Sequence, residues 1–298
     1  MMQKILLTGL NGQVGHALQA KLGDYELFAL SRDQLDLTNA DQMRRVLREI
    51  KPNLIINPAA YTAVDKAESE PELAHAINAT APQILAEEAA KLGAALIHFS
   101  TDYVYHGTKT GAYIETDAVN PVSIYGKTKL AGEEAIRQVG IPHLILRTSW
   151  VYGVYGKNFL KTILRLAAER ENIGIVADQF GAPTSSESIA NSLIDLINIW
   201  NPQQTEQTGV YHFTNAGNTS WYGFSCEIIN EYKHLASQRN WPALRLKEIS
   251  AITTADYPTP AARPANSVLN NTKLKQVFAI ELPSWQQGLQ QVMQQIEV

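Results

Sequence analysis

Cysteine, basic charge and long apolar runs are all scarce in this sequence, and each scarcity excludes a class of protein. The 298 residues include one cysteine, Cys226, so no internal disulfide can form. No apolar run approaches the roughly 20 residues of a membrane-spanning helix, and the N-terminal apolar stretch is shorter than a signal-peptide core. The net charge of −4 offers no broad basic surface for nucleic acid. We therefore expect a cytoplasmic protein that binds neither membranes nor nucleic acid.

Histidine is also sparse. The seven histidines show no spacing typical of metal ligands, so no metal site is predicted. Hydrophobic residues make up 45% and charged residues 18% of the chain, which is the balance of a globular protein. The length suits one large α/β domain, or a nucleotide-binding domain with a smaller appendage.

In the first half of the chain, short apolar runs alternate with segments of helical periodicity. The clearest apolar runs are 5–8, 27–30, 54–57 and 94–100, and a fifth follows at 143–147. This order predicts the α/β class, with a Rossmann-type doubly wound parallel sheet as the dinucleotide-binding domain in residues 1–150.

The regular alternation loosens after residue 150. Residues 151–298 are predicted to form a smaller mixed C-terminal part that mainly binds substrate and is interleaved with the first part. Its expected helices are 158–169, 186–200, 221–236 and 284–296.

A glycine motif follows the first apolar run. Gly9, Gly12 and Gly15 are spaced three apart where a strand turns into a helix. Backbone without Cβ atoms lets amide N–H groups approach a pyrophosphate. A plain strand–turn–helix also uses glycine, but the place of this motif at the start of an α/β pattern favours nucleotide binding. The loop, including Asn11, is therefore a candidate cofactor site.

The residues after the second apolar run bear on the choice of cofactor. A cation at this point favours a ribose 2′-phosphate, and a carboxylate favours a free 2′-hydroxyl. Ser31 and Arg32 therefore favour NADPH, while the nearby Asp33 and Asp36 leave NADH open. Arg32 is alternatively a solvated loop charge, and Asp36 with Leu37 alternatively borders the adenine.

A second motif, Tyr125-Gly126-Lys127-Thr128-Lys129, places a phenol and an ammonium one helical turn apart. A phenol exchanges a proton at neutral pH only if a cation stabilises its phenolate, and a nearby lysine does so. Ser100 and Thr101 end the fourth apolar run, where a hydroxyl can hold the substrate oxygen beside the tyrosine. Together with the glycine loop, this order of motifs predicts a catalytic site.

With these residues identified, the chain resembles the extended short-chain dehydrogenases, and within them the dTDP-4-dehydrorhamnose reductase (dTDP-L-rhamnose synthase) family. The resemblance covers nearly the whole length. Beyond the generic motifs, it is carried by more specific blocks at 57–68, 147–152, 178–184 and 263–267.

The resemblance implies NAD(P)H-dependent reduction of the C4 ketone of dTDP-6-deoxy-L-lyxo-4-hexulose to dTDP-L-rhamnose, by a monomer or homodimer. Tyr125 would donate the proton, Lys129 would lower the tyrosine pKa and hold the nicotinamide ribose, and Thr101 would tune the tyrosine. The implied cofactor contacts are Gly12, Gln13, Val14, Ala59, Ala60 and Tyr61. The implied substrate contacts are Asp102, Tyr103 and Trp150 around the sugar, and Arg263 and Asn266 at the diphosphate.

Alternatives stay open at this point. Trp150 is alternatively a core side chain, and Arg263 an exposed loop charge. A related dehydratase has Asp then Glu beside the strand-end threonine, whereas here Asp102 precedes Tyr103, which disfavours elimination. Another reductase or epimerase of the superfamily, or a non-catalytic NADP-binding regulatory subunit, would share the motifs. Some relatives dimerise through a magnesium site with an acid on the first helix; the region of His16 has none, so metal-linked dimerisation is not expected.

Overall fold

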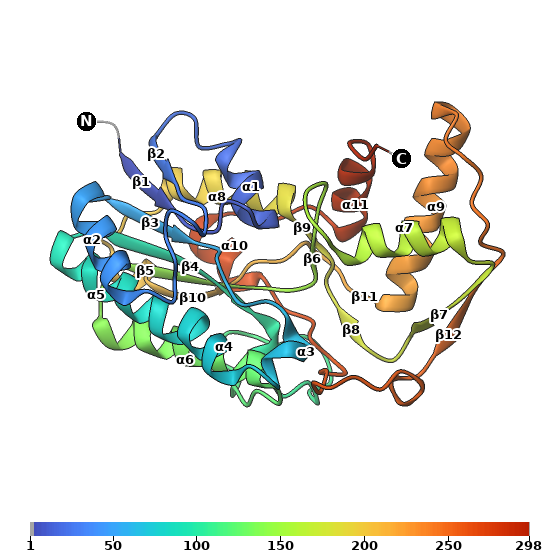
Figure 1. The fold of residues 1–298 in the computed structure, drawn as a ribbon, viewed down its shortest axis with the longest axis horizontal. Helices are drawn as coiled ribbons and strands as arrows, with labels where there is room; N and C mark the ends of the chain where they lie inside the picture. The colour runs from blue at the N-terminus through green and yellow to red at the C-terminus, as the bar shows by residue number, and fades with distance from the viewer. Residues whose placement is uncertain (1–2, 298) are drawn as a thin grey trace.

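The computed structural model describes residues 3–297, and its centre is a six-stranded sheet in the order β10-β5-β4-β3-β1-β2 (Figure 1). Every pairing in this sheet is parallel. Since β2 and β3 lie on opposite sides of β1, the chain reverses direction across the sheet at β1, and ligands bind at such a switch point. The strands are β1 (Lys4–Leu7), β2 (Glu26–Ala29), β3 (Leu54–Asn57), β4 (Ala95–Thr101), β5 (His143–Thr148) and β10 (Gly209–His212).

Helices cover both faces of the sheet because the strands are apolar on both sides. Ile5 and Leu7 point to one face and Leu6 to the other, as alternation along a strand requires. The Ile5 face packs on α1 (Gln13–Gln19), α8 (Ser186–Ile199) and α10 (Thr272–Phe278). The Leu6 face packs on α2 (Ala40–Ile50), α5 (Ala81–Leu92) and α6 (Ile124–Val139).

The predicted α/β fold is confirmed, and the five predicted strands lie within two residues of their expected ends. The helical stretch between β3 and β4 is divided in the structure. It begins as α4 (Pro71–His75), passes through a π-helical turn, Ala76–Thr80, and continues as α5; the short α3 (Val64–Ala67) precedes it.

A second group of elements lies beside the sheet, on the side where the C-terminus is found (Figure 1). Its core contains Tyr152, Phe224 and Trp285. Three helices supply most of this core: α7 (Phe159–Glu169), α9 (Trp221–Arg239) and α11 (Trp285–Met293). Three two-stranded sheets complete the group, pairing β6 (Val151–Tyr152) with β9 (Thr184–Ser185), β7 (Asn172–Val176) with β12 (Glu248–Ile252), and β8 (Phe180–Gly181) with β11 (Thr219–Ser220).

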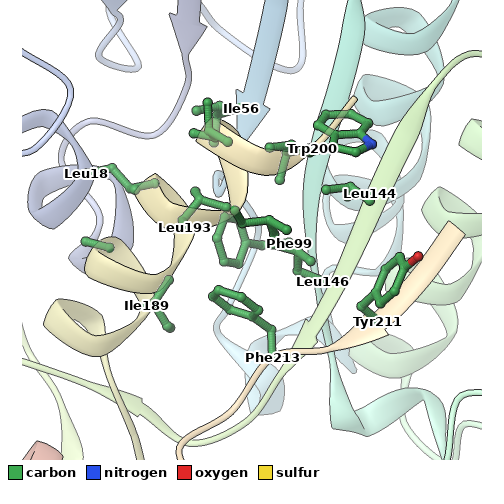
Figure 2. Close-up of a cluster of buried hydrophobic side chains, with 14 of the residues drawn as sticks. Leu18, Ile56, Phe99, Leu144, Leu146, Ile189, Leu193, Trp200, Tyr211 and Phe213 are labelled. Carbon is green, nitrogen blue, oxygen red and sulfur yellow. The ribbon is translucent and has the colours of Figure 1, made fainter. Parts of the chain in front are cut away.

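The C-terminal half also contributes directly to the sheet. Figure 2 shows Ile189 and Leu193 of α8 among Phe99, Leu146 and Phe213, in one buried cluster. Strand β10 adds to the edge at β5. Residues on both sides of position 150 therefore build one core.

Within residues 3–297, no helix has both the length and the apolar composition required to cross a lipid bilayer.

Candidate active site

A cavity of about 460 Å³ opens at the carboxyl ends of the sheet strands. Residues that follow β1, β2 and β3 line one side, and Tyr125 and Lys129 of α6 line another. All the predicted cofactor residues except Ser31 and Tyr61 face this cavity; they are Gly9, Asn11, Gly12, Gln13, Val14, Arg32, Asp36, Leu37, Ala59, Ala60, Tyr125 and Lys129.

The glycine loop fits the close approach that a dinucleotide requires. Gly9 has φ +64°, and a Cβ there would lie 2.9 Å from the Cα of Ala59. A Cβ on Gly15 would lie 2.1 Å from the carbonyl oxygen of Gly9. Gly12 caps α1 without a side-chain hydrogen bond, so backbone donors face the cavity. The loop therefore provides the bare backbone cradle that a pyrophosphate requires.

Arg32 and Asp36 lie at the end of the cavity that follows β2. The backbone N–H and hydroxyl of Thr38 both donate to the Asp36 carboxylate, at 2.9 and 2.8 Å, and lower its pKa. Arg32 is exposed and forms no salt bridge within residues 3–297. The Ser31 hydroxyl donates to Gln34, 3.1 Å away. The exposed guanidinium of Arg32 is therefore the cation available to a phosphate here.

Helix α6 presents its lysine to the cavity from a buried position. Lys129 is 1% exposed, and its Nζ donates to the carbonyl oxygen of Phe99 at 2.6 Å and lies 3.1 Å from Nε2 of His98. Burial lowers the pKa of Lys129 to about 8, although the charge of Glu133 acts in the opposite direction. The ammonium form therefore predominates at neutral pH but is lost in mild alkali.

The net shift of the Tyr125 pKa runs opposite to the lowering that was expected from Lys129. Burial raises the pKa of Tyr125 to about 12, while a hydrogen bond with Thr101 lowers it and the charge of Asp102 raises it. Desolvation of the phenolate outweighs the neighbouring groups, and the Nζ of Lys129 is directed at β4. Tyr125 therefore keeps its proton at neutral pH.

Of the two hydroxyls at the end of β4, Thr101 is the one beside the tyrosine. The Ser100 hydroxyl donates to Glu133 at 2.5 Å, and Glu133 is held by Arg147 at 2.9 Å from its Nε. Ser100 therefore belongs to a buried structural network. Thr101 accepts from the Tyr103 N–H at 3.3 Å and donates to Asp102 at 2.9 Å.

The predicted sugar contacts lie next to this strand end. The Asp102 carboxylate is buried, its Oδ2 has no hydrogen-bond partner within residues 3–297, and burial raises its pKa to about 6. The Tyr103 ring meets the Tyr125 ring edge-on, with centroids 5.5 Å apart. Trp150 has φ +47° and stacks on Trp221 at 3.5 Å. Non-glycine residues in this strained conformation cluster at functional sites.

The remaining predicted residues are occupied by contacts within the chain. Arg263 forms a salt bridge of 2.9 Å with Asp65, and its other terminal nitrogen, Nη1, is buried without a partner within residues 3–297. Asn266 donates to the carbonyl oxygens of Lys109 and Gly111 at 2.8 and 2.7 Å, so its amide group holds a loop. The Tyr61 hydroxyl donates to Glu70 at 2.5 Å. The ligand contacts of these residues stay predictions.

Several residues of the site carry no motif that sequence reasoning uses. Gly156 and Lys157 line the cavity from the loop after β6, and Asn158 donates to the Gln13 side chain at 3.1 Å. Trp221 supports Trp150. Only the tertiary fold brings these residues to the glycine loop. Among residues 3–297, no three His, Cys, Asp or Glu side chains are grouped as metal ligands would be.

A bare-backbone cradle and a phenol that retains its proton share one cavity, and this pairing is typical of the nicotinamide-dependent reductases with a Rossmann fold. The family model described as the RmlD substrate binding domain matches residues 2–298. The chain belongs to this family, the dTDP-4-dehydrorhamnose reductases, and the resemblance drawn from its motifs is confirmed.

Relatives named as dTDP-4-dehydrorhamnose reductases are similar over almost their whole length. The dTDP-4-dehydrorhamnose reductase of Aggregatibacter actinomycetemcomitans is 45% identical, with 98% of each chain covered. The protein of the same name from Escherichia coli K12 is 44% identical, over 98% of this chain and 97% of that one. A crystal structure of the Bacillus anthracis dTDP-4-dehydrorhamnose reductase in complex with NADP is 36% identical, with a TM-score of 0.89 and coverage of 99% and 100%.

Proposed function

We propose that this chain uses NADPH to reduce the C4 ketone of dTDP-6-deoxy-L-lyxo-4-hexulose, giving dTDP-L-rhamnose, and that NADH is a poorer donor. The observation that carries the proposal is the shared cavity of the glycine loop, Tyr125 and Lys129, in a chain that matches named reductases from end to end.

The chain itself supplies the proton and the orientation. NADPH, when bound, supplies the hydride for the ketone carbon. Tyr125 gives its phenolic proton to the C4 oxygen as that oxygen gains negative charge, so the product is a neutral alcohol. The Thr101 hydroxyl, which donates to Asp102 in this structure, would turn its one proton to the phenolate that remains. A high pKa keeps Tyr125 protonated until the transfer, which suits a reduction.

Lys129 acts as a hydrogen-bond donor held at a fixed position in the wall of the cavity. An ammonium has three N–H donors, and one of them is held by the Phe99 carbonyl, with another placed to meet His98. The third is free for a ligand in the cavity that Lys129 lines, which suits the hydroxyls of the nicotinamide ribose. The positive charge also favours the phenolate of Tyr125 after proton transfer.

The sugar nucleotide is assigned to the region beside the cavity, since its predicted contacts are not among the residues that line the cavity. Asp102, Tyr103 and Trp150 would line the sugar pocket, and Arg263 would bind the diphosphate after exchanging Asp65 for phosphate oxygens, which its planar donors match. In this scheme residues 1–150 mainly bind the cofactor and residues 151–298 mainly bind the substrate. We place the reaction in the cytoplasm, in a monomer or homodimer.

The test is oxidation of NADPH by the dTDP-keto sugar, followed by the loss of the near-ultraviolet absorbance of the reduced nicotinamide. Tyr125→Phe should lower kcat by about a hundredfold or more, because the proton donor is lost, with the Kd for NADPH nearly unchanged. Tyr25→Phe, which removes a hydroxyl bonded to Asn198 outside the cavity, is the matched control and should leave kcat unchanged.

An unimpaired Tyr125→Phe enzyme would refute the role of the phenol. A wild-type protein that binds NADPH but oxidises none with the keto sugar would refute the reductase and favour the regulatory subunit.

A further inference from the structure

A row of buried polar side chains runs from Lys129 into the sheet, and the reaction described above uses none of its other members. The Nζ of Lys129 lies 3.1 Å from Nε2 of His98, and Nδ1 of His98 lies 3.0 Å from the side-chain nitrogen of Asn57. The Asn57 oxygen accepts from the Thr8 hydroxyl at 2.6 Å. The row thus joins β4, β3 and the residue after β1, where the glycine loop begins.

The setting of this row is dry. His98 and Asn57 are fully buried and Thr8 is 1% exposed, and the strands around them are aliphatic. Polar groups in such a place lower stability unless each one is hydrogen-bonded. Both ring nitrogens of His98 have a partner, so the ring is fixed in orientation as well as in position.

The charge on Lys129 determines which ring nitrogen of His98 carries the proton. An ammonium can only donate, so Nε2 must accept from it and Nδ1 must carry the ring proton. The Asn57 amide, whose nitrogen faces Nδ1 in this structure while its oxygen accepts from Thr8, must then turn to present its oxygen to Nδ1. A neutral amine can also accept, and the amide orientation in this structure matches that polarity. Half a turn of one amide group therefore accompanies the change in charge.

We propose that His98 is a positioning residue for Lys129: its Nε2 acceptor holds the ammonium in the cavity and favours the charged form, and the Asn57 amide turns to match the tautomer of the ring. The contacts stand independently of the substrate. The consequence for turnover rests on the proposed reductase function, since there Lys129 must be charged to hold the ribose and the phenolate.

The other groups around Lys129 do not replace this acceptor. On α6, Glu133 lies one turn further along, but its carboxylate binds Arg147 of β5 and the hydroxyl of Ser100. Tyr125, also on α6, is a protonated phenol. From β4, the Phe99 carbonyl oxygen accepts one hydrogen bond from the ammonium, and Nε2 of His98 accepts a second. His98 stays neutral, because burial and the charge of Lys129 hold its pKa well below the ordinary range.

Two substitutions separate the two sides of the imidazole. In His98→Gln the longer amide reaches the position of Nε2 and keeps an acceptor for Lys129. In His98→Asn the shorter amide reaches only the position of Nδ1, so the contact with Asn57 is kept and the contact with Lys129 is lost. Both variants stay polar and small enough for the site. His143→Asn, at a buried histidine of β5 that bonds the Ile141 carbonyl, is the matched control.

The direct measurement is the titration of Lys129 in protein labelled with ¹³C at the lysine ε-carbons, followed by NMR without cofactor or substrate. The resonance that disappears in Lys129→Met identifies the residue. In the wild type we expect Lys129 to titrate with a midpoint at about pH 8. A charged group that loses a hydrogen-bond acceptor in a dry site should titrate about one unit lower, so His98→Asn should show that shift. His98→Gln and His143→Asn should stay at the wild-type midpoint.

An unshifted midpoint in His98→Asn would overturn the proposal, as would an equal shift in His98→Gln or in His143→Asn. The pH at which kcat/KM falls on the alkaline side of its pH profile should shift together with the NMR midpoint in the same variants. If that pH does not shift in His98→Asn, the link between His98 and turnover is overturned. If the wild type reduces no keto sugar, the reductase function fails, and the NMR comparison still decides the role of His98.

Discussion

At the scale of single residues, one physical cause moves two proton donors in opposite directions. Burial raises the pKa of the Tyr125 phenol to about 12 and lowers the pKa of the Lys129 ammonium to about 8. Desolvation disfavours whichever form is charged, so it opposes loss of a proton from tyrosine and favours loss of a proton from lysine. Near neutral pH both groups are protonated. A cavity that contains two protonated donor groups is suited to stabilising and protonating an alkoxide.

Arg32 carries the prediction about cofactor choice. Arg32→Ala should lower kcat/KM for NADPH by about tenfold and leave kcat/KM for NADH nearly unchanged. The reason is that its guanidinium is the exposed cation at the end of the cavity assigned to the adenosine ribose and its 2′-phosphate. The measurement is steady-state kinetics with both cofactors. Arg45→Ala, at an exposed arginine of α2 away from the cavity, is the control and should alter neither value. Equal losses with both cofactors would show that Arg32 does not discriminate the 2′-phosphate.

At the scale of elements, a π-helical turn positions α6, the helix that carries Tyr125 and Lys129. Asn78 in this turn accepts from the Tyr61 N–H at 2.8 Å and donates to the Thr128 hydroxyl at 3.2 Å. It therefore ties the loop after β3 to α6, beside Lys129. A Cβ on Gly132 would lie 2.2 Å from the Asn78 carbonyl oxygen, so the two helices approach as closely as glycine allows. Single π-turns inside helices are frequent at functional sites.

Helices α2 and α5 are joined by an ion cluster that should give stability a defined pH dependence. The buried Glu88 carboxylate binds Arg48 of α2 and Lys91 of its own helix, each at 2.7 Å. The hydrogen bond from Arg48 lowers the pKa of Glu88 to about 2, with burial acting in the opposite direction and Lys91 assisting. Because the pKa of Glu88 in the folded protein lies below the ordinary glutamate pKa of 4.5, the contribution is complete above pH 4.5 and is lost as the pH falls toward 2.

Glu88→Gln should therefore lower the free energy of unfolding by about 1 kcal/mol at neutral pH, a modest value because the cationic partners are exposed to solvent. The difference from the wild type should shrink as the pH falls from 7 to 3. Urea unfolding at several pH values measures it. Glu87→Gln, which breaks the half-exposed pair with Arg44, should cost less. A Glu88→Gln deficit that is constant with pH would contradict the ionic origin.

At the scale of the whole molecule, the nucleotide-binding sheet does not belong to the N-terminal half alone. Helix α8 fills one face of the sheet with Ile189 and Leu193, and Tyr211 of β10 and Phe213, which follows that strand, extend the core at the β5 edge (Figure 2). Helix α10 adds Leu274 to the same cluster. In the chain, these residues lie between segments that build the second core, which extends from Tyr152 to Ile296. The core around the sheet is therefore complete only when the C-terminal half of the chain is also folded.

A fragment comprising residues 1–150 should consequently fail to fold cooperatively, although it contains both motifs of the active site. Without α8, α10 and β10, one face of the sheet would expose the side chains of β1, β4 and β5 that those elements cover. Thermal unfolding followed by near-ultraviolet circular dichroism, with the full chain as the reference, tests this. A fragment with a cooperative transition and the NADPH affinity of the full chain would contradict it.

The sequence by itself determined the local elements and the order of the motifs. Short apolar runs and period-3.6 patterns placed the first five strands and the helices between them, and spacing put Tyr125 and Lys129 on one face of a helix. These features depend on residues a few positions apart, so a single sequence contains them. The family resemblance rested on the same short blocks and is confirmed over nearly the whole chain.

Only the tertiary structure decided the surroundings of those motifs. It turned Lys129 toward His98, which lies 31 positions earlier. It also enclosed Tyr125 so that desolvation raises the tyrosine pKa, opposite to the expected direction. It also assigned Ser100 to the Glu133 network and brought Gln13 to Asn158 across 145 positions. A pKa and a hydrogen-bond partner depend on which distant segments exclude water from a side chain, and no local spacing records that.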